Sequence, residues 1–161
     1  MPRTAIAEDA RGLVAAPPPR LALPAVNPDA YRAMVAFSTA AEEGLDPVVA
    51  DLVRIRVSQL NGCGFCLDLH SGAARTAGVD ERRLSALAAW RLTPFFDRRE
   101  RAALALAEAV TLLATSPDLD HTYDEAAATF GERELGALLW TIAAINAWNR
   151  IAVPTRTAPI P

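Results

Sequence analysis

The sequence predicts an all-helical domain. No segment shows the sustained alternation of polar and apolar residues that is typical of a half-buried strand. Apolar residues make up 52% of the 161 residues, and alanine, leucine and valine supply most of them, which suits closely packed helices. Capping residues and prolines before helix-length segments, and glycines or prolines after them, divide most of the chain into helices. We therefore expect one domain with a substantial core.

Prolines set the N-terminal segment apart from this core. The triplet at 17–19 and Pro24 prevent a continuous helix. Residues 1–16 have the character of a disordered leader, and from Arg20 onward we expect an extended segment that lies across the domain or a neighbouring subunit. The expected organisation is an N-terminal arm (1–26), a helical domain (27–152) and an extended C-terminal tail (153–161).

Helix start signals define the elements of the domain in order. Asn27-Pro28 and Asp46-Pro47 each combine an N-cap residue with a proline at the first helical position, and Asp80 is a third N-cap residue. Residues 97–100 and 122–125 carry the pattern of a capping box. The predicted helices cover residues 27–43, 48–60, 63–77, 80–90, 97–114, 122–130 and 132–151.

The second and third of these helices are joined at a Cys-X-X-Cys motif. Asn61-Gly62 ends one helix, and Cys63 and Cys66, the two cysteines of the chain, lie in the first turn of the next. The free N–H groups and the positive end of the helix dipole favour a thiolate there. Cys63, Cys66 and His70 stand at offsets of zero, three and seven, so they share one helical face. This pattern indicates a reversible dithiol/disulfide redox site with a histidine to handle the proton.

Asp51 extends the predicted site if the two helices fold back as a hairpin. Asp51 lies about 13 Å along the first helix from the turn, and His70 lies about 12 Å along the second, at roughly 1.5 Å per residue. The carboxylate is then level with the imidazole and can orient it. The sequence thus predicts a relay of Cys63, Cys66, His70 and Asp51.

These residues carry a resemblance to a known family. The run from Leu52 to Cys66 (LVRIRVSQLNGCGFC), His70 and the later segment INAWNR at 145–150 resemble the carboxymuconolactone decarboxylase family, in its alkylhydroperoxidase AhpD-like branch. The resemblance implies an all-α, AhpD-like helical bundle whose central αα hairpin carries the motif, and homo-oligomers, trimeric or hexameric. It also implies reduction of a hydroperoxide with no cofactor, followed by reduction of the enzyme by an external, lipoyl-type dithiol. By resemblance, Cys66 matches the peroxidatic cysteine, Cys63 the resolving cysteine and His70 the relay histidine.

Two positions differ from the AhpD pattern. Asp51 stands where the family has a glutamate that is one methylene longer, and we expect a bridging water to span the shortened reach. Phe65 stands where AhpD has a further histidine, and its ring cannot carry a proton.

Composition and charge exclude several other classes of function. The formal net charge of −3 and a pI near 5.4 give no basic surface for nucleic acid or an anionic membrane. No apolar run approaches the roughly 20 residues of a membrane span, and the N-terminus lacks the apolar region of a secretory signal. We therefore expect a cytoplasmic protein, in which a Cys-X-X-Cys pair is typically redox-active or metal-binding.

Two alternatives stay open for the central motif. Cys63, Cys66 and His70, with Asp51 or His121, supply enough ligands for zinc, although no second Cys or His pair exists. The protein can also be a non-catalytic helical oligomer in which the cysteines are small buried hydrophobic residues.

His121 otherwise has the setting of a surface histidine. Finally, three polar residues in the last apolar helix are expected to form structural hydrogen bonds: Asn146, Asn149 and Arg150.

Overall fold

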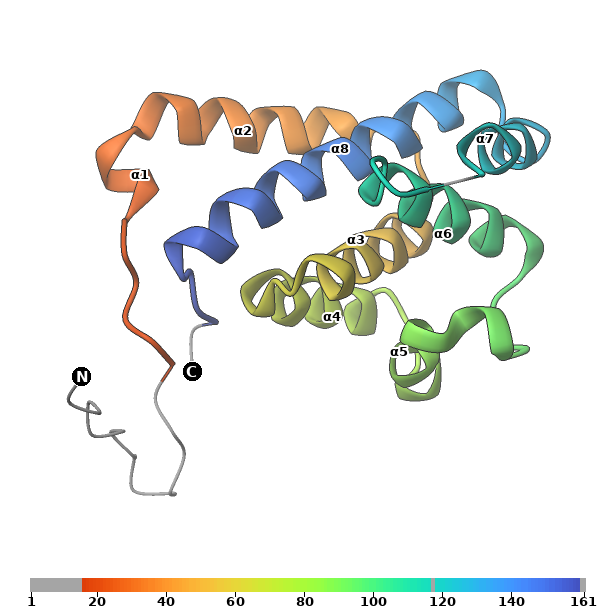
Figure 1. The fold of residues 1–161 in the computed structure, drawn as a ribbon, viewed down its shortest axis with the longest axis horizontal. Coiled ribbons are helices and arrows are strands. Elements are labelled where there is room, and N and C mark those ends of the chain that lie inside the picture. Colours follow the sequence, from red (N-terminus) through yellow and green to blue (C-terminus); the bar gives the residue numbers. More distant parts are fainter. Residues whose placement is uncertain (1–15, 117, 160–161) are drawn as a thin grey trace.

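The computed structural model describes residues 16–116 and 118–159, and over these ranges the protein is built from α-helices and one 3-10 helix, without strands (Figure 1). The prediction of an all-α fold is confirmed. No helix of the described ranges is long and apolar enough to cross a membrane. The elements are α1 (Leu23–Val26), α2 (Pro28–Ala41), α3 (Pro47–Asn61), α4 (Gly64–Thr76), α5 (Glu81–Ala86), η1 (Leu87–Leu92), α6 (Arg98–Thr111), α7 (Leu119–Ala127) and α8 (Glu132–Thr155).

Helix α3 lies at the centre of the molecule, packed against α4, α6 and α8. Val53 and Val57 are fully buried in a core that α3 forms with α6 and α8. Leu52 and Ile55, on another side of the helix, belong to a second core that includes Leu87 of η1. Full burial of one such side chain contributes about 1.5–3 kcal/mol. A helix buried on two sides gives the hairpin with α4 a rigid base.

The ends of α3 follow the expected capping chemistry. The Asp46 carboxylate accepts hydrogen bonds from the N–H groups of Val48 (2.9 Å) and Val49 (3.1 Å), so the helix begins at Pro47. At the other end Gly62 has φ +69°, a left-handed conformation that costs glycine little. The Cys63 N–H then donates to the Ser58 carbonyl at 3.0 Å, and α4 starts at once in the opposite direction.

The long helix α8 runs alongside α2 and ends beside the N-terminal arm (Figure 1). Trp148 of α8 packs edge-on against Tyr31 of α2, with ring centroids 5.3 Å apart. The arm is attached to the end of α8 through Arg20, whose N–H donates to the Thr155 carbonyl at 2.8 Å. The arm is therefore held against the end of α8, and α2 packs along the same helix.

Several predicted boundaries need correction. The capping box predicted at 122–125 is wrong: α7 already begins at Leu119, and the Thr122 hydroxyl donates back to the Asp118 and Leu119 carbonyls inside the helix. The helix predicted at 80–90 is α-helical only to Ala86 and continues as η1. Helix α6 ends at Thr111, three residues before the predicted end.

Both chain ends also differ in detail from the predicted arm and tail. A single turn, α1, forms within the predicted arm, with Pro24 at its start, where proline is tolerated. Helix α8 continues to Thr155, so the first residues of the predicted tail are helical. Residues 1–15 of the predicted arm, and 160–161 of the predicted tail, lie outside the described residues.

A largely buried carboxylate joins the second core together. Glu108 of α6 accepts hydrogen bonds from Arg56 Nε (2.7 Å), Trp90 Nε1 (2.9 Å) and the Arg91 guanidinium. Burial alone raises the pKa of Glu108, but the hydrogen bonds from Arg91, Trp90 and Arg56 outweigh it and hold that pKa below the ordinary 4.5. The ionised carboxylate thus connects α3, η1 and α6.

Candidate active site

The Cys-X-X-Cys motif occupies the start of α4, at the turn of the central hairpin. Cys63 is the N-cap residue, and its sulfur accepts a hydrogen bond from the Cys66 N–H at 3.3 Å. The two residues are joined by a disulfide, with their Cα atoms 5.4 Å apart. They are only 2% and 3% exposed. The turn therefore holds a buried disulfide whose Cys63 sulfur already has a donor that also stabilises a thiolate.

His70 lies one turn after Cys66 on α4, and both residues line the same cavity. This cavity has a volume of about 730 Å3 and is walled by α2, α3, α4, α8, the arm and the tail. Its lining is mainly apolar and includes the side chains of Tyr31, Val35, Phe65, Leu69, Ile145 and Trp148. An apolar cavity with a few polar groups at one place is the usual form of a small-molecule site.

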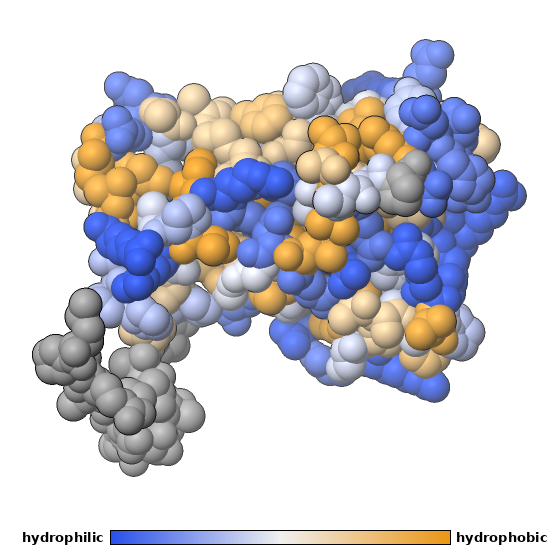
Figure 2. All heavy atoms as spheres, in the orientation of Figure 1, coloured by the Kyte–Doolittle hydropathy of each residue, from blue (hydrophilic) through white to orange (hydrophobic). Residues whose placement is uncertain are grey.

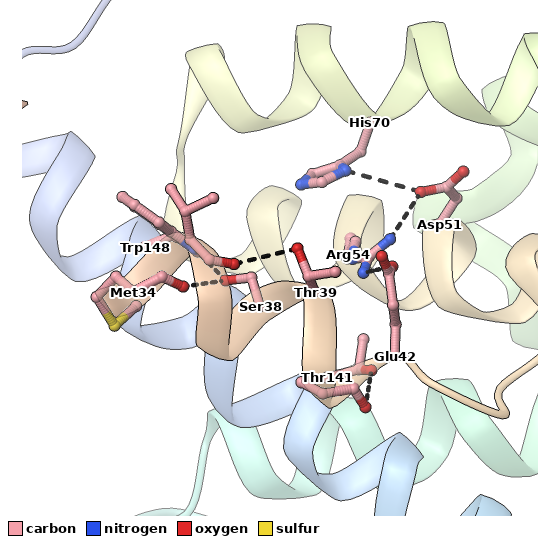
Figure 3. Close-up of polar contacts among 11 residues, drawn as sticks. Met34, Ser38, Thr39, Glu42, Asp51, Arg54, His70, Thr141 and Trp148 are labelled. Carbon is pink, nitrogen blue, oxygen red and sulfur yellow. Dashed lines mark hydrogen bonds and ion pairs between the residues drawn. The ribbon is translucent and has the colours of Figure 1, made fainter. Parts of the chain in front are cut away.

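Opposite His70, the hairpin places the carboxylate of Asp51 (Figure 3). Asp51 Oδ1 lies 3.7 Å from His70 Nδ1, and both side chains are largely buried. The separation exceeds the 2.7–3.2 Å of a direct hydrogen bond, so the two side chains face each other without one. Asp51 can therefore orient His70 without holding it firmly.

Arg54 also contacts Asp51, which sequence reasoning missed. Its Nη1 lies 3.3 Å from Asp51 Oδ1, and its other terminal nitrogen donates to Glu42 at the end of α2 (Figure 3). Both Arg54 and Glu42 line the large cavity. The signal for Arg54 was its spacing of three residues from Asp51 on one helix. No local signal exists for Glu42, because a different helix supplies it.

Two asparagines of α8 hold the turn between α3 and α4 in place through hydrogen bonds. The Asn61 amide donates to Asn146 Oδ1 and Asn149 Oδ1, both at 3.0 Å, and Asn149 Nδ2 donates to the Ser58 hydroxyl at 3.1 Å. Arg150 donates to the Asn146 carbonyl at 3.1 Å. Asn146 and Asn149 are buried, so the expectation of structural hydrogen bonds for these three residues is confirmed. The network ties the residue before the Gly62 turn to the longest helix.

The structure thus brings Cys63, Cys66, His70 and Asp51 to the hairpin, and it leaves His121 elsewhere. His121 is exposed on α7, with Nε2 3.6 Å from Glu125 Oε1. Over residues 16–116 and 118–159, no three His, Cys, Asp or Glu side chains are grouped so that they could hold a metal ion. The zinc constellation considered from the sequence is not assembled in that part of the chain.

Comparisons with known proteins connect this arrangement to a family. The sequence model of the carboxymuconolactone decarboxylase family matches residues 28–109. The chain is 37% identical over 112 residues to the uncharacterized protein YdfG of Bacillus subtilis, which covers 70% of this chain and 76% of YdfG. It is 40% identical over 53 residues to the alkyl hydroperoxide reductase AhpD of Streptomyces coelicolor, a match that covers 33% of this chain and 30% of that relative.

A solved structure extends the likeness to most of the chain. It is the crystal structure of a protein of unknown function from Agrobacterium tumefaciens, which has been put forward as an antioxidant defence protein AhpD. The two chains share 32% sequence identity and a TM-score of 0.85, over 89% of this chain and 100% of the other.

Proposed function

This chain belongs to the carboxymuconolactone decarboxylase family, and from that premise we propose that it is a thiol-dependent hydroperoxide reductase of the AhpD-like branch. The observation that carries the proposal is the cavity that Cys66 shares with His70. A thiol and a proton carrier at one apolar cavity suit the reduction of an organic hydroperoxide. The similarity to alkyl hydroperoxide reductases supports this reading over part of the chain.

The proposed reaction begins with the reduced dithiol. His70 takes the proton of Cys66, and the thiolate attacks the terminal oxygen of the hydroperoxide, which breaks the O–O bond. The products are a sulfenic acid on Cys66 and an alkoxide that takes the proton from His70 and leaves as the alcohol, or as water from hydrogen peroxide. Cys63 then attacks the sulfenic sulfur, releases water and closes the disulfide.

Asp51 and Phe65 distinguish this site from the AhpD pattern. Asp51 would hold the imidazole in position through a contact of 3.7 Å, which a longer glutamate can shorten. Phe65 lines the cavity and carries no proton, so proton transfer falls to His70 alone. We therefore expect a functional dithiol with a slower peroxide step than a site with both family residues.

A half-reaction assay tests the proposal. Reduced protein mixed with cumene hydroperoxide should lose two thiols and form the Cys63–Cys66 disulfide. Cys66→Ser should abolish turnover, whereas Cys63→Ser should stop at a sulfenic acid that dimedone traps on Cys66. Full hydroperoxide turnover by Cys66→Ser, with a suitable reductant, would show that the proposed chemistry is wrong. Thiols that stay unreactive in the folded protein would favour the non-catalytic alternative.

Each cycle then needs a reductant from outside the chain. We propose an external dithiol of the lipoyl type, as the family resemblance implies, because a dithiol returns two electrons and closes its own disulfide. We also propose that the protein works in the cytoplasm, where thiol pools are reducing.

Exposed apolar side chains support a homo-oligomer, trimeric or hexameric by the family resemblance. Apolar residues gather over α1 and α2 in the view of Figure 2. Val26 is 55% exposed and Val35 is 45% exposed, and on α8 Trp140 is 60% exposed with its ring edge-on to Phe37. Exposed apolar side chains that gather over neighbouring helices are typical of protein interfaces. We expect subunit contacts through this face.

A further inference from the structure

The two cysteines border different cavities. Cys66 lines the cavity of about 730 Å3 that contains His70, whereas Cys63 lines a second cavity of about 250 Å3. The two cavities share part of their lining, including Phe65, Ala152 and residues 157–159. The cysteines are only 2% and 3% exposed, and in the described part of the chain each of them borders one of these cavities. The disulfide is therefore approached from two sides.

The second cavity, which we call the Cys63 cavity, lies between the hairpin turn and the end of α8. Its lining includes Gly62 and Gly64, which flank Cys63, and Val153 and Arg156 of α8 and its C-cap. Apart from the chain neighbours of each glycine and the backbone of its own helix, no described atom lies within 4 Å of the point where a Cβ would stand on Gly62 or Gly64. The two residues that flank Cys63 therefore add no side chain of their own to this cavity.

We propose that the Cys63 cavity is the entrance for the reducing dithiol, and that Cys63 is the sulfur this dithiol attacks. The proposal rests on the proposed function for the overall reaction, and it adds the route and the attacked atom. Substrate and reductant then use different sides of one disulfide, and neither has to leave before the other enters.

Reduction of the Cys63–Cys66 disulfide proceeds through two thiol–disulfide exchanges. A thiolate of the reductant attacks Cys63 Sγ, the Cys63–Cys66 bond breaks, and its electron pair leaves on Cys66 as a thiolate. The second thiol of the reductant, after losing its proton, attacks the reductant sulfur of the mixed disulfide and releases Cys63 as a thiolate. The reductant leaves as a disulfide, having supplied two electrons and two protons.

Both sulfurs have partners as leaving groups, and the need to keep the substrate cavity free favours this order of attack. The first thiolate is released from Cys66, in the cavity of His70, where an imidazole can supply a proton. The second is released from Cys63, whose sulfur accepts the Cys66 N–H at 3.3 Å. Attack on Cys66 would instead leave a mixed disulfide in the cavity that the hydroperoxide needs. In the proposed sequence each leaving sulfur has a partner, and the mixed disulfide stays out of the substrate cavity.

The first experiment narrows each cavity separately. Protein oxidised with diamide is mixed with dihydrolipoamide, and the loss of the disulfide is followed by rapid quenching and alkylation. Val153→Trp should lower the rate of disulfide reduction about tenfold. Gly64→Ala should lower this rate by a smaller factor. Leu69→Trp, which narrows only the large cavity, should slow oxidation by cumene hydroperoxide and leave reduction unchanged. Gly72→Ala is the matched control on α4, since Gly72 lines neither cavity.

The second experiment uses the unaltered protein, so it does not depend on how a variant folds. Oxidised protein is exposed briefly to 2-mercaptoethanol, which has no second thiol for an intramolecular second exchange, and is quenched with acid and alkylated before a second molecule reacts. Fragmentation of the peptide by mass spectrometry should place the adduct on Cys63. An adduct on Cys66 would overturn the proposal. So would a disulfide that is reduced more slowly in Leu69→Trp and at the unaltered rate in Val153→Trp. Both experiments start from a chemically formed disulfide, so a failure of cumene hydroperoxide to oxidise the thiols would count against the proposed function alone.

Discussion

Replacing Asp51 by asparagine removes the charge that faces His70 and keeps the shape of the side chain. A hydrogen bond to a charged group contributes about 1.5–3 kcal/mol. The Asp51–His70 contact, at 3.7 Å, is longer than such a bond, so we take the lower end, about 1.5 kcal/mol, as its upper bound. At 1.36 kcal/mol for each factor of ten, Asp51→Asn should slow peroxide-driven disulfide formation by up to about tenfold.

Lengthening the same side chain tests the geometry in the opposite direction. A hydrogen bond between the carboxylate and His70 Nδ1 needs a separation of about 2.9 Å, so the present contact must shorten by roughly 0.8 Å. The added methylene of Asp51→Glu extends the side chain by about one C–C bond, roughly 1.5 Å. A direct hydrogen bond would then orient His70 more firmly. We expect Asp51→Glu to oxidise faster than the unaltered protein, by up to about tenfold.

The assay is the oxidation half-reaction alone. Prereduced protein is mixed with excess cumene hydroperoxide, quenched with acid at intervals, and its free thiols are alkylated and counted by mass spectrometry. Asp68→Asn is the control for loss of charge, because Asp68 is exposed on α4 and lines neither cavity. If Asp51→Asn and Asp51→Glu both oxidise at the unaltered rate, Asp51 is an ordinary helix residue and the relay ends at His70.

Three further predictions concern stability and assembly. Since hydrogen bonds hold the pKa of Glu108 below 4.5, its ionised form stabilises the fold above pH 4.5, and this stabilisation is lost as the pH falls through the lowered pKa. Glu108→Gln should therefore lower the free energy of unfolding by about 2 kcal/mol at pH 7 and weaken its dependence on pH in the acid range. Urea denaturation at a series of pH values measures both effects. If the free energy of unfolding falls with acid equally in both proteins, this reasoning is wrong. Asn61→Ala leaves the side-chain oxygen of Asn149 without a donor, whereas that of Asn146 keeps the Arg150 guanidinium. The same measurement should show a fall of about 1–3 kcal/mol in the free energy of unfolding, and an unchanged value would show that the network is dispensable. Trp140→Glu should shift sedimentation toward smaller species, and a stable monomer of the unaltered protein at micromolar concentration would refute the proposed oligomer.

Helix boundaries and the hairpin could be predicted because their signals are local. Asp46 caps α3 through hydrogen bonds to residues two and three positions away, and Gly62 ends it through its own backbone conformation. The position of Cys63 and Cys66 at the start of α4 follows from the same turn. The failed capping box at Thr122 shows the limit of such signals, because the hydroxyl bonded to carbonyls of a helix that had begun earlier.

The surroundings of the disulfide depended on contacts between distant parts of the chain. The sequence by itself determined the helices, the Cys-X-X-Cys turn and the hairpin register that sets Asp51 beside His70. Only the tertiary structure decided that Glu42 reaches Arg54, that Asn61 bonds to α8, and that the arm and the tail help to enclose two cavities. The reason is physical: caps and turns are fixed by hydrogen bonds within a few residues, whereas a cavity is the space left when helices far apart in sequence pack.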